Sequence, residues 1–280
     1  MQIRRVAASL VVSCALAAGW SAIARGQASP TLPIEPVKES GQSVTGAFEG
    51  WYDNPDGSHT LLVGYFNRNS KQSLDIPVGP NNRIEPSGPD YGQPTYFQPR
   101  RQWGVFTIVV PREFGEHKLT WTLVANGQTT VVPLHLDPLW IVAPFKDVAL
   151  GNTPPVLRFA ADGEAFTGPP RGIAATYYAD LAYPLRLNVW VTDDGIRAPE
   201  ARRPVRPLSV AWSKFRGIGD VTFSNPTPEV EEKTGQATTN ARFRNRGEYI
   251  LRVQVNDTTG EGGGGFQCCW TNAHVKVVIP

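Results

Sequence analysis

The stretch HKLTWTLVANGQTTVVPLHL, residues 117–136, decides the fold class. Every second residue of LTWTL, 119–123, is apolar, and this period of two is typical of a strand with one buried and one solvated face. The Asn126-Gly127 pair between two such runs is a strong signal for a two-residue β-hairpin. The stretch therefore predicts antiparallel strands that bury one face against a core.

Similar short runs separated by turn residues fill the rest of the chain. VTGAFEGWY, residues 44–52, leads through the turn DNPDG into SHTLLVGYFN, and QWGVFTIVV follows at 102–110. The 25 prolines, 27 glycines and single methionine suit short strands better than helices. Many short strands with regular turn signals are typical of β-sandwiches. We therefore predict an all-β protein with two antiparallel, Ig-like β-sandwich domains that follow a cleaved signal peptide.

Shifts in composition suggest where the parts of the chain begin and end. A chain of this length, 280 residues, has room for two domains of ordinary size. Two adjacent prolines, Pro154 and Pro155, stiffen the segment between the two β-rich halves. The expected parts are a signal peptide (1–28), a tail (29–43), an N-terminal sandwich (44–142), a linker (143–156) and a C-terminal sandwich (157–280).

The N-terminus has the three regions of a secretory signal. MQIRR is positively charged, Val6 to Ala24 is apolar, and GQA at 26–28 offers small residues before a cut. Two alternatives are an uncleaved membrane anchor and a lipoprotein attached through Cys14, because VVSC loosely resembles a lipobox. We expect ordinary export to the periplasm or the extracellular space, and no other segment approaches a membrane span.

The charge balance argues against a nucleic-acid partner. The whole chain carries a net charge of +2, but the signal contains three arginines and no acid. Without it, 24 basic residues face 25 acidic ones, a net charge of −1. Binding to a phosphate backbone needs a clustered positive surface, which this composition does not suggest.

The C-terminal part resembles a PKD-type or related Ig-like domain, over about 207–279. The residues that carry the resemblance are Trp212, GIGDVTF (217–223), Phe243, RGEYILRVQVND (246–257) and AHVKVVI (273–279). The resemblance implies a fold and is nearly silent on activity. The chain departs from the pattern by inserting TTGEGGGGFQCCWTN, residues 258–272, between the last two strands. The N-terminal part resembles no family beyond the sandwich class.

Two adjacent cysteines, Cys268 and Cys269, lie in that insertion. An oxidising compartment disfavours free thiols, so a vicinal disulfide is one expectation. Neighbouring residues of a regular strand point to opposite faces, so such a bond requires a turn, for which the preceding glycines give room. Links to another chain and buried thiols are the alternatives. A bonded pair could be a simple staple, or could form an apolar platform with Phe266 and Trp270 that binds a ligand.

Metal sites are weaker candidates, and we expect no cofactor. Cys268, Cys269 and His274 offer ligands for copper or zinc, with a fourth from His59, His117 or His135, but no standard motif spacing occurs. Calcium could bind carboxylates near turns, which are Asp193, Asp194, Asp220 and Asp257. The glycine run lacks the Lys-Ser/Thr ending and the helix of a phosphate loop.

A second candidate surface is the aromatic loop SGPDYGQPTYFQPRRQW, residues 87–103. Aromatic rings could stack on a ligand and arginines could pair with carboxylates. Alternatively, the rings cover the end of the N-terminal core. The candidate binding residues here are Tyr91, Tyr96, Phe97, Arg100, Arg101 and Trp103.

The sequence therefore favours a non-enzymatic recognition or assembly module that binds a glycan, a cell-surface component or a protein partner through loops. A periplasmic redox- or metal-linked accessory protein that uses Cys268 and Cys269 is the first alternative. A carbohydrate-active enzyme with an accessory β-domain is the second. No G-x-S-x-G motif occurs, and Glu49, Asp53 and Asp56 are neighbouring acids around one turn rather than a convincing catalytic pair.

Overall fold

Strands are the main secondary structure of the residues that the structure, a computed structural model, describes. These parts are residues 38–86, 88, 90–149, 151–196, 208–257 and 268–280, so the expected signal peptide lies outside them. Within them the only helices are two short 3-10 turns, η1 (Arg112–Phe114) and η2 (Pro138–Trp140). The predicted all-β class is confirmed.

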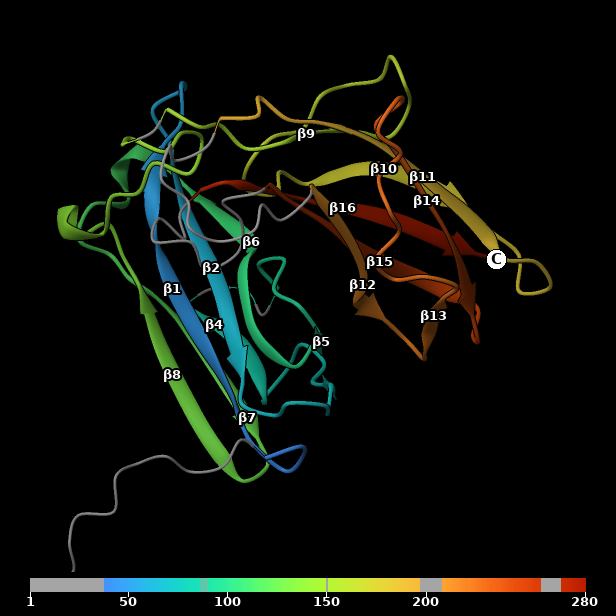
Figure 1. Cartoon of the computed structure of the whole chain (residues 1–280). Coiled ribbons are helices and arrows are strands. Elements are labelled where there is room, and N and C mark those ends of the chain that lie inside the picture. Colours follow the sequence, from blue (N-terminus) through green and yellow to red (C-terminus); the bar gives the residue numbers. More distant parts are fainter. Residues whose placement is uncertain (1–37, 87, 89, 150, 197–207, 258–267) are drawn as a thin grey trace, which may run out of the picture. The chain divides into compact units, whose positions relative to one another are not determined.

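Two sheets of antiparallel strands build the first half of the protein, and a short pair accompanies them (Figure 1). The first sheet has the order β1 (Val44–Asp53), β2 (His59–Asn67), β6 (Arg100–Val110). The second has the order β4 (Asn82–Glu85), β7 (Leu119–Ala125), β8 (Gln128–Leu134), and the short pair is β3 (Leu74–Asp75) with β5 (Tyr96–Phe97).

The predicted hairpin joins β7 to β8. Leu119 pairs with Leu134 and Ala125 with Gln128, which leaves Asn126 and Gly127 as the two turn residues. Both have positive φ, 49° and 76°, as a type I′ turn requires. The hairpin prediction is therefore confirmed. At its centre Trp121 is fully buried, and its indole Nε1 donates to Asn82 Oδ1 at 3.0 Å.

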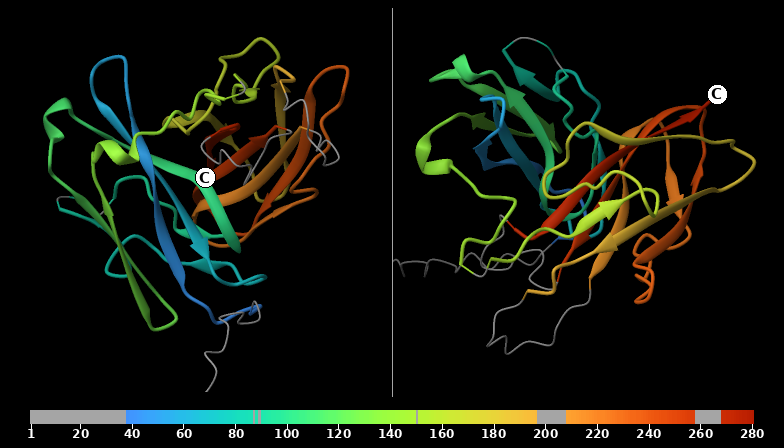
Figure 2. Two further views of the ribbon diagram at one scale, coloured as in Figure 1. Left: turned by 60° about the vertical axis from the view of Figure 1, so that its left-hand side comes forward. Right: turned by 90° about the horizontal axis from the view of Figure 1, so that it is seen from above.

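Two four-stranded sheets build the second half, as in Ig-like sandwiches (Figures 1 and 2). The last strand, β16, pairs antiparallel with β15 and parallel with β10. One sheet has the order β10 (Ile173–Tyr178), β16 (Trp270–Ile279), β15 (Gly247–Asn256), β12 (Ser209–Gly217). The other has the order β13 (Val221–Phe223), β14 (Gln236–Phe243), β11 (Leu185–Thr192), β9 (Val156–Arg158).

Strand β15 is buried on both of its faces. Leu251, Val253 and Val255 belong to the core between the two sheets of the second half. Ile250, from the opposite face of β15, packs instead against the core of the first half, and Phe215 of β12 belongs to that core as well. Residues 37–280 accordingly form one compact unit.

Candidate functional site

The contact of β15 and β16 with β6 and β1, which we call the seam, is built around the buried guanidinium of Arg252. Its side chain donates from Nη1 to Gln102 Oε1 at 2.9 Å and from Nη2 to the Trp103 carbonyl at 3.1 Å. Its Nε donates to Asn272 Oδ1 at 3.1 Å. Arg252 is only 3% exposed, so its charge is compensated by these fixed acceptors rather than by water.

Asn272 and Trp270 of β16 complete this contact. The Asn272 amide donates to the carbonyls of Trp103, at 3.1 Å, and of Gly104, at 2.8 Å. The Trp270 ring, 2% exposed, lies on Gly104, which has a positive φ of 51° and presents no side chain. Glycine is required here both for the backbone angle and for the close approach of the ring.

Glu49 of β1 is the acid of the seam. Its carboxylate accepts from Arg101 Nη2 and from the Gly104 N–H, each at 2.7 Å. The side chain is 7% exposed, and burial raises its pKa to about 7, although Arg101 and the Gly104 N–H act in the opposite direction. Burial is the dominant effect, so a proton binds Glu49 near neutral pH.

Two further ion pairs join β12 to the first half of the protein beside the seam. Lys214 Nζ, on a side chain that is 4% exposed, lies 2.8 Å from Asp75 Oδ1. Arg216 donates to both carboxylate oxygens of Asp90, at 2.9 and 2.7 Å, and its Nε donates to the Gln93 carbonyl at 2.6 Å. The hydrogen bonds from Arg216 lower the pKa of Asp90.

The structure places much of the predicted aromatic loop at the seam. Phe97 is fully buried in the first core, 4.9 Å from the Tyr65 ring between centroids, in line with the alternative that the rings cover that core. The Arg101 guanidinium stacks over the Trp103 ring at 3.8 Å, and Lys214 Nζ lies 4.5 Å from the Tyr96 ring centroid. The remaining two residues differ, since Tyr91 is half-buried while Arg100 is exposed.

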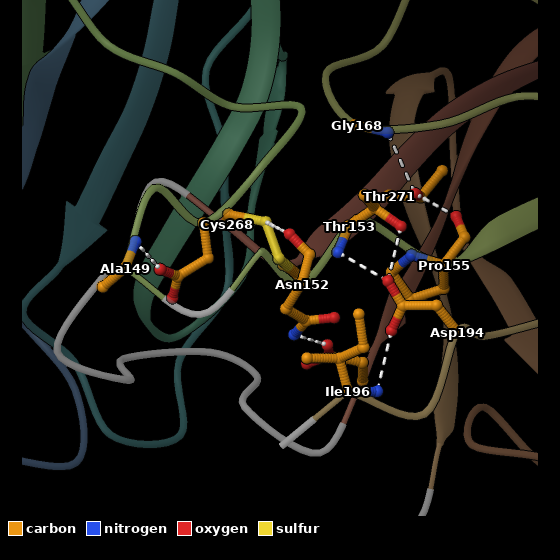
Figure 3. Close-up of a disulfide and its surroundings, with 12 residues drawn as sticks. Ala149, Asn152, Thr153, Pro155, Gly168, Asp194, Ile196, Cys268 and Thr271 are labelled. Carbon is orange, nitrogen blue, oxygen red and sulfur yellow. Dashed lines mark hydrogen bonds between the residues drawn. A yellow bond between two sulfur atoms is a disulfide. The ribbon is translucent and has the colours of Figure 1, made fainter. Parts of the chain in front are cut away.

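The cysteine pair lies beneath the surface, at the start of β16. Cys268 is 6% and Cys269 0% exposed, and in the structure a disulfide joins their sulfur atoms (Figure 3). Cys268 Sγ lies 3.8 Å from the Asn152 carbonyl oxygen, and Asn152 Nδ2 donates to Asp257 Oδ2 at 2.6 Å. These contacts tie the turn to the segment before β9.

Of the expected ligand platform, the three residues that the structure describes, Cys268, Cys269 and Trp270, are buried. Phe266 lies outside the described residues. Trp270 packs with Tyr52, Leu62 and Val142 in a small core of its own, because the chain enters β16 at this residue. The described part of the insertion is therefore core rather than a loop that faces solvent.

The candidate metal ligands are dispersed. Among the residues that the structure describes, no three His, Cys, Asp or Glu side chains gather in a group that could hold a metal ion. Asp194 accepts from Thr153 Oγ1 at 2.7 Å, and Asp193 from the Gly195 N–H at 3.0 Å. His274 is buried beside the Phe215 ring, with 4.1 Å between their centroids.

One surface was missed by the sequence reading. Between residues 139 and 148, beyond the end of β8, lie five large apolar side chains with exposed fractions between 39% and 91%. We call this surface the apolar strip; it consists of Leu139, Trp140, Ile141, Phe145 and Val148. The run LWIV, 139–142, was a signal for it, but these residues were assigned to the end of the N-terminal sandwich (44–142), and Phe145 and Val148 to the linker (143–156).

The described parts of the chain thus define a β-sandwich protein whose strands are antiparallel except for the β10–β16 pair, and comparisons add no family. No family model and no curated protein matches the sequence. Also within the described parts, no helix is long and apolar enough to cross a membrane.

Several solved structures share a distant likeness over most of the chain. The D00-D0 domain of intimin is 12% identical, covers 84% of this chain and 100% of its own, and has a TM-score of 0.26. The titin Ig tandem A164-A165 is 14% identical, covers 85% of this chain and 99% of its own, and has a TM-score of 0.22. The Yersinia pseudotuberculosis adhesin InvE is 11% identical, covers 84% of this chain and 58% of its own, and has a TM-score of 0.25. At these scores the likeness assigns neither a family nor a function, and the PKD relationship stays a prediction.

Proposed function

We propose that the protein is an exported, non-enzymatic binding module that contacts a protein partner of the cell surface or periplasm through the apolar strip. The observation that carries this proposal is the exposure of the strip, in which Leu139 is 91% and Val148 86% exposed. Monomeric proteins seldom expose large apolar side chains together, and such groups mark interaction surfaces.

The part of the strip from Leu139 to Ile141 is held against β1. The Val142 N–H donates to the Trp51 carbonyl at 3.0 Å, and the Trp51 indole donates to the Asp137 carbonyl at 2.8 Å. The Trp140 ring stacks on Phe48, with 5.4 Å between centroids. A surface already held in place loses little conformational entropy on binding, which favours affinity.

The chemistry of the strip favours a protein over a glycan. Leu139, Ile141 and Val148 are aliphatic, whereas sugar rings are usually held by flat aromatic faces and hydrogen-bonding groups. Part of the Trp140 ring is already covered by Phe48 and by His135. The proposal therefore commits to apolar side chains on the partner.

Export and oxidation of the cysteine pair belong to the same proposal. The N-terminal 28 residues have the pattern of a signal peptide, and a disulfide between Cys268 and Cys269 would persist in an oxidising compartment. We assign the pair a structural role, because both side chains are buried and Cys268 contacts the backbone of Asn152.

The test is binding of the labelled mature protein to the envelope fraction of the cells that produce it. The double variant Leu139→Ser/Val148→Ser should lose most of the saturable binding, and protease treatment of the envelope should abolish binding of the wild type. The matched control is Tyr178→Ser/Val131→Ser, which changes side chains that are 78% and 57% exposed elsewhere on the surface. Equal binding by the strip variant, or binding that survives protease, would contradict the proposal.

A further inference from the structure

One sheet of the second half has a face that takes no part in the seam. Strands β12 and β15 contribute residues to both large cores, whereas the sheet β13-β14-β11-β9 packs on the core of the second half alone. In β11 the residues of that core are Leu187, Val189 and Val191. Successive side chains of a strand point to opposite faces. Arg186 and Trp190 of β11 therefore lie on the other face, where Arg186 is exposed and Trp190 half-buried.

Strand pairing places a guanidinium group and an amide beside Trp190. Its direct partners are Arg158 on β9 and Gln236 on β14. Directly paired residues of antiparallel strands carry their side chains on the same face of the sheet. By the same rule Arg186 lies beside Asn240. We call this surface the Trp190 face; it consists of Arg158, Arg186, Trp190, Gln236, Asn240 and, two residues beyond Asn240 on β14, Arg242.

The Trp190 face carries positive charge without a balancing acid. The four strands of this sheet contain three arginines, Arg158, Arg186 and Arg242, and no Asp or Glu. Within the described parts of the chain, none of the three takes part in an ion pair. Of the acids beyond the strand ends, Asp194 and Glu231 accept hydrogen bonds from threonine hydroxyls. The charge of this face therefore suits an anionic ligand.

The other side chains of the Trp190 face suit sugar rings. Among the described residues, the side-chain amides of Gln236 and Asn240 have no hydrogen-bond partner, and both residues are half-buried. An amide both donates and accepts, as a sugar hydroxyl requires. The flat ring of Trp190 can cover the apolar side of a sugar. The planar fork of an arginine binds a carboxylate through two parallel hydrogen bonds.

We propose that the Trp190 face binds an acidic glycan, a chain of sugar rings that carry carboxylate groups. Trp190 stacks on one ring, the arginines pair with the carboxylates, and the amides bond the hydroxyls. From Gln236 to Arg242 the face extends along β14 for about 20 Å, which is the length of a short oligosaccharide rather than of one sugar. This site lies on residues other than those of the apolar strip, so it adds a second ligand to the protein partner proposed above.

The test is a calorimetric titration of the mature protein, at low salt, with hexamers of galacturonic acid and of mannuronic acid. Maltohexaose supplies the same number of rings without charge, and polyglutamate supplies carboxylates without sugar rings. At least one acidic hexamer should bind roughly tenfold more tightly than either control ligand. Equal binding of maltohexaose would overturn the role of the arginines, and equal binding of polyglutamate would overturn a glycan as the ligand. Binding of neither acidic hexamer in the millimolar range would overturn the site.

Variants locate the binding. Trp190→Ala should weaken it roughly tenfold. Arg186→Gln/Arg242→Gln, at two exposed positions, should weaken it and remove most of its dependence on salt. The matched control, Arg112→Gln/Lys118→Gln, removes the same charge from exposed positions of the first half and should leave binding unchanged. Equal losses in the two double variants would show that only net charge attracts the ligand, and would overturn the site even if Trp190→Ala did not fold.

The two binding proposals can fail separately. The strip variant Leu139→Ser/Val148→Ser should bind the acidic hexamer as the wild type does, and loss of this binding would contradict a site on the Trp190 face. The envelope experiment is carried out with saturating acidic hexamer, which blocks the Trp190 face. The binding that remains then reports the apolar strip alone.

Discussion

Arg252 donates from Nη1 to Gln102 Oε1 at 2.9 Å, across a separation of 150 residues in the chain. This bond joins β15 of the second half to β6 of the first, and the Trp103 carbonyl accepts a second bond from the same guanidinium. The outer face of a sheet that would otherwise be solvated is therefore buried. The contacts of the seam therefore join the two sandwiches into one compact unit.

Replacing Arg252 by methionine should destabilise the protein by about 3 kcal/mol, because a buried network loses its donor and leaves several acceptors unpaired. Methionine keeps most of the apolar volume, so the loss reports the polar contacts. Chemical denaturation measures the change in the free energy of unfolding. Arg242→Met, at an exposed position on β14, is the matched control and should change it by less than about 0.5 kcal/mol. Similar effects of the two variants would refute the structural role of Arg252.

Gly104→Ala should destabilise far more than Gly127→Ala. Both glycines have positive φ, so both variants bear the backbone cost of roughly 1–2 kcal/mol. A Cβ at Gly104 would also overlap the Trp270 ring, whereas a Cβ at Gly127 meets nothing within 4 Å. We expect an additional loss of about 1–3 kcal/mol at Gly104, measured as a shift in the denaturation midpoint. Equal losses would show that Trp270 does not lie on Gly104.

Glu49 predicts a specific dependence of stability on pH. Its pKa is about 7 in the folded protein and near 4.5 when unfolded, so the folded state holds the proton more tightly. The contribution of Glu49 to the free energy of unfolding is complete below about pH 4.5 and is lost as the pH rises through 7. Glu49→Gln should therefore gain stability relative to the wild type across this window, on the order of 3 kcal/mol. A constant difference between the two proteins would contradict the raised pKa.

His274 predicts the opposite trend on the acid side. Its pKa of about 3 is below the ordinary value of 6.5, so the unfolded state takes up a proton that the folded ring refuses. Stability from this group is present above pH 6.5 and is lost as the pH falls toward 3. The Glu49→Gln variant lacks the loss of stability that titration of Glu49 causes as the pH rises. Its free energy of unfolding should therefore rise between about pH 4.5 and 6.5. Flat stability in that variant would contradict a neutral, buried His274.

The state of the cysteines is settled by mass spectrometry. Alkylation of the denatured mature protein should leave Cys268 and Cys269 unmodified, and prior reduction should allow both to react in a monomer. Two thiols that alkylate without reduction would contradict the disulfide. They would also revive the redox or metal alternative.

Local patterns were sufficient to predict the hairpin and the long strands of the first half, but not the short strands β3, β4 and β5. The alternation in 119–123 and the Asn126-Gly127 turn depend on residues close in sequence, and they appear in the structure as expected. The resemblance of the C-terminal part rests on equally local motifs. It led to the expected pair of sheets around Trp212.

The seam could not be predicted in the same way, because it depends on contacts between distant segments. An aromatic residue such as Trp270 at the end of a loop has the same sequence pattern whether it faces solvent or another sandwich. One signal was present: Arg252 and Gln254 alternate with apolar residues on β15 but are buried. A strand with a wet face gives the same alternation, and only the partner surface on β6 separates the two cases.

Scanning calorimetry of the mature protein tests the joining of the two sandwiches. The buried contacts of Arg252, Asn272 and Glu49 predict one cooperative transition, with equal calorimetric and van't Hoff enthalpies. Two separable transitions in the wild type, with one insensitive to Arg252→Met, would show that the halves unfold independently and would contradict the seam.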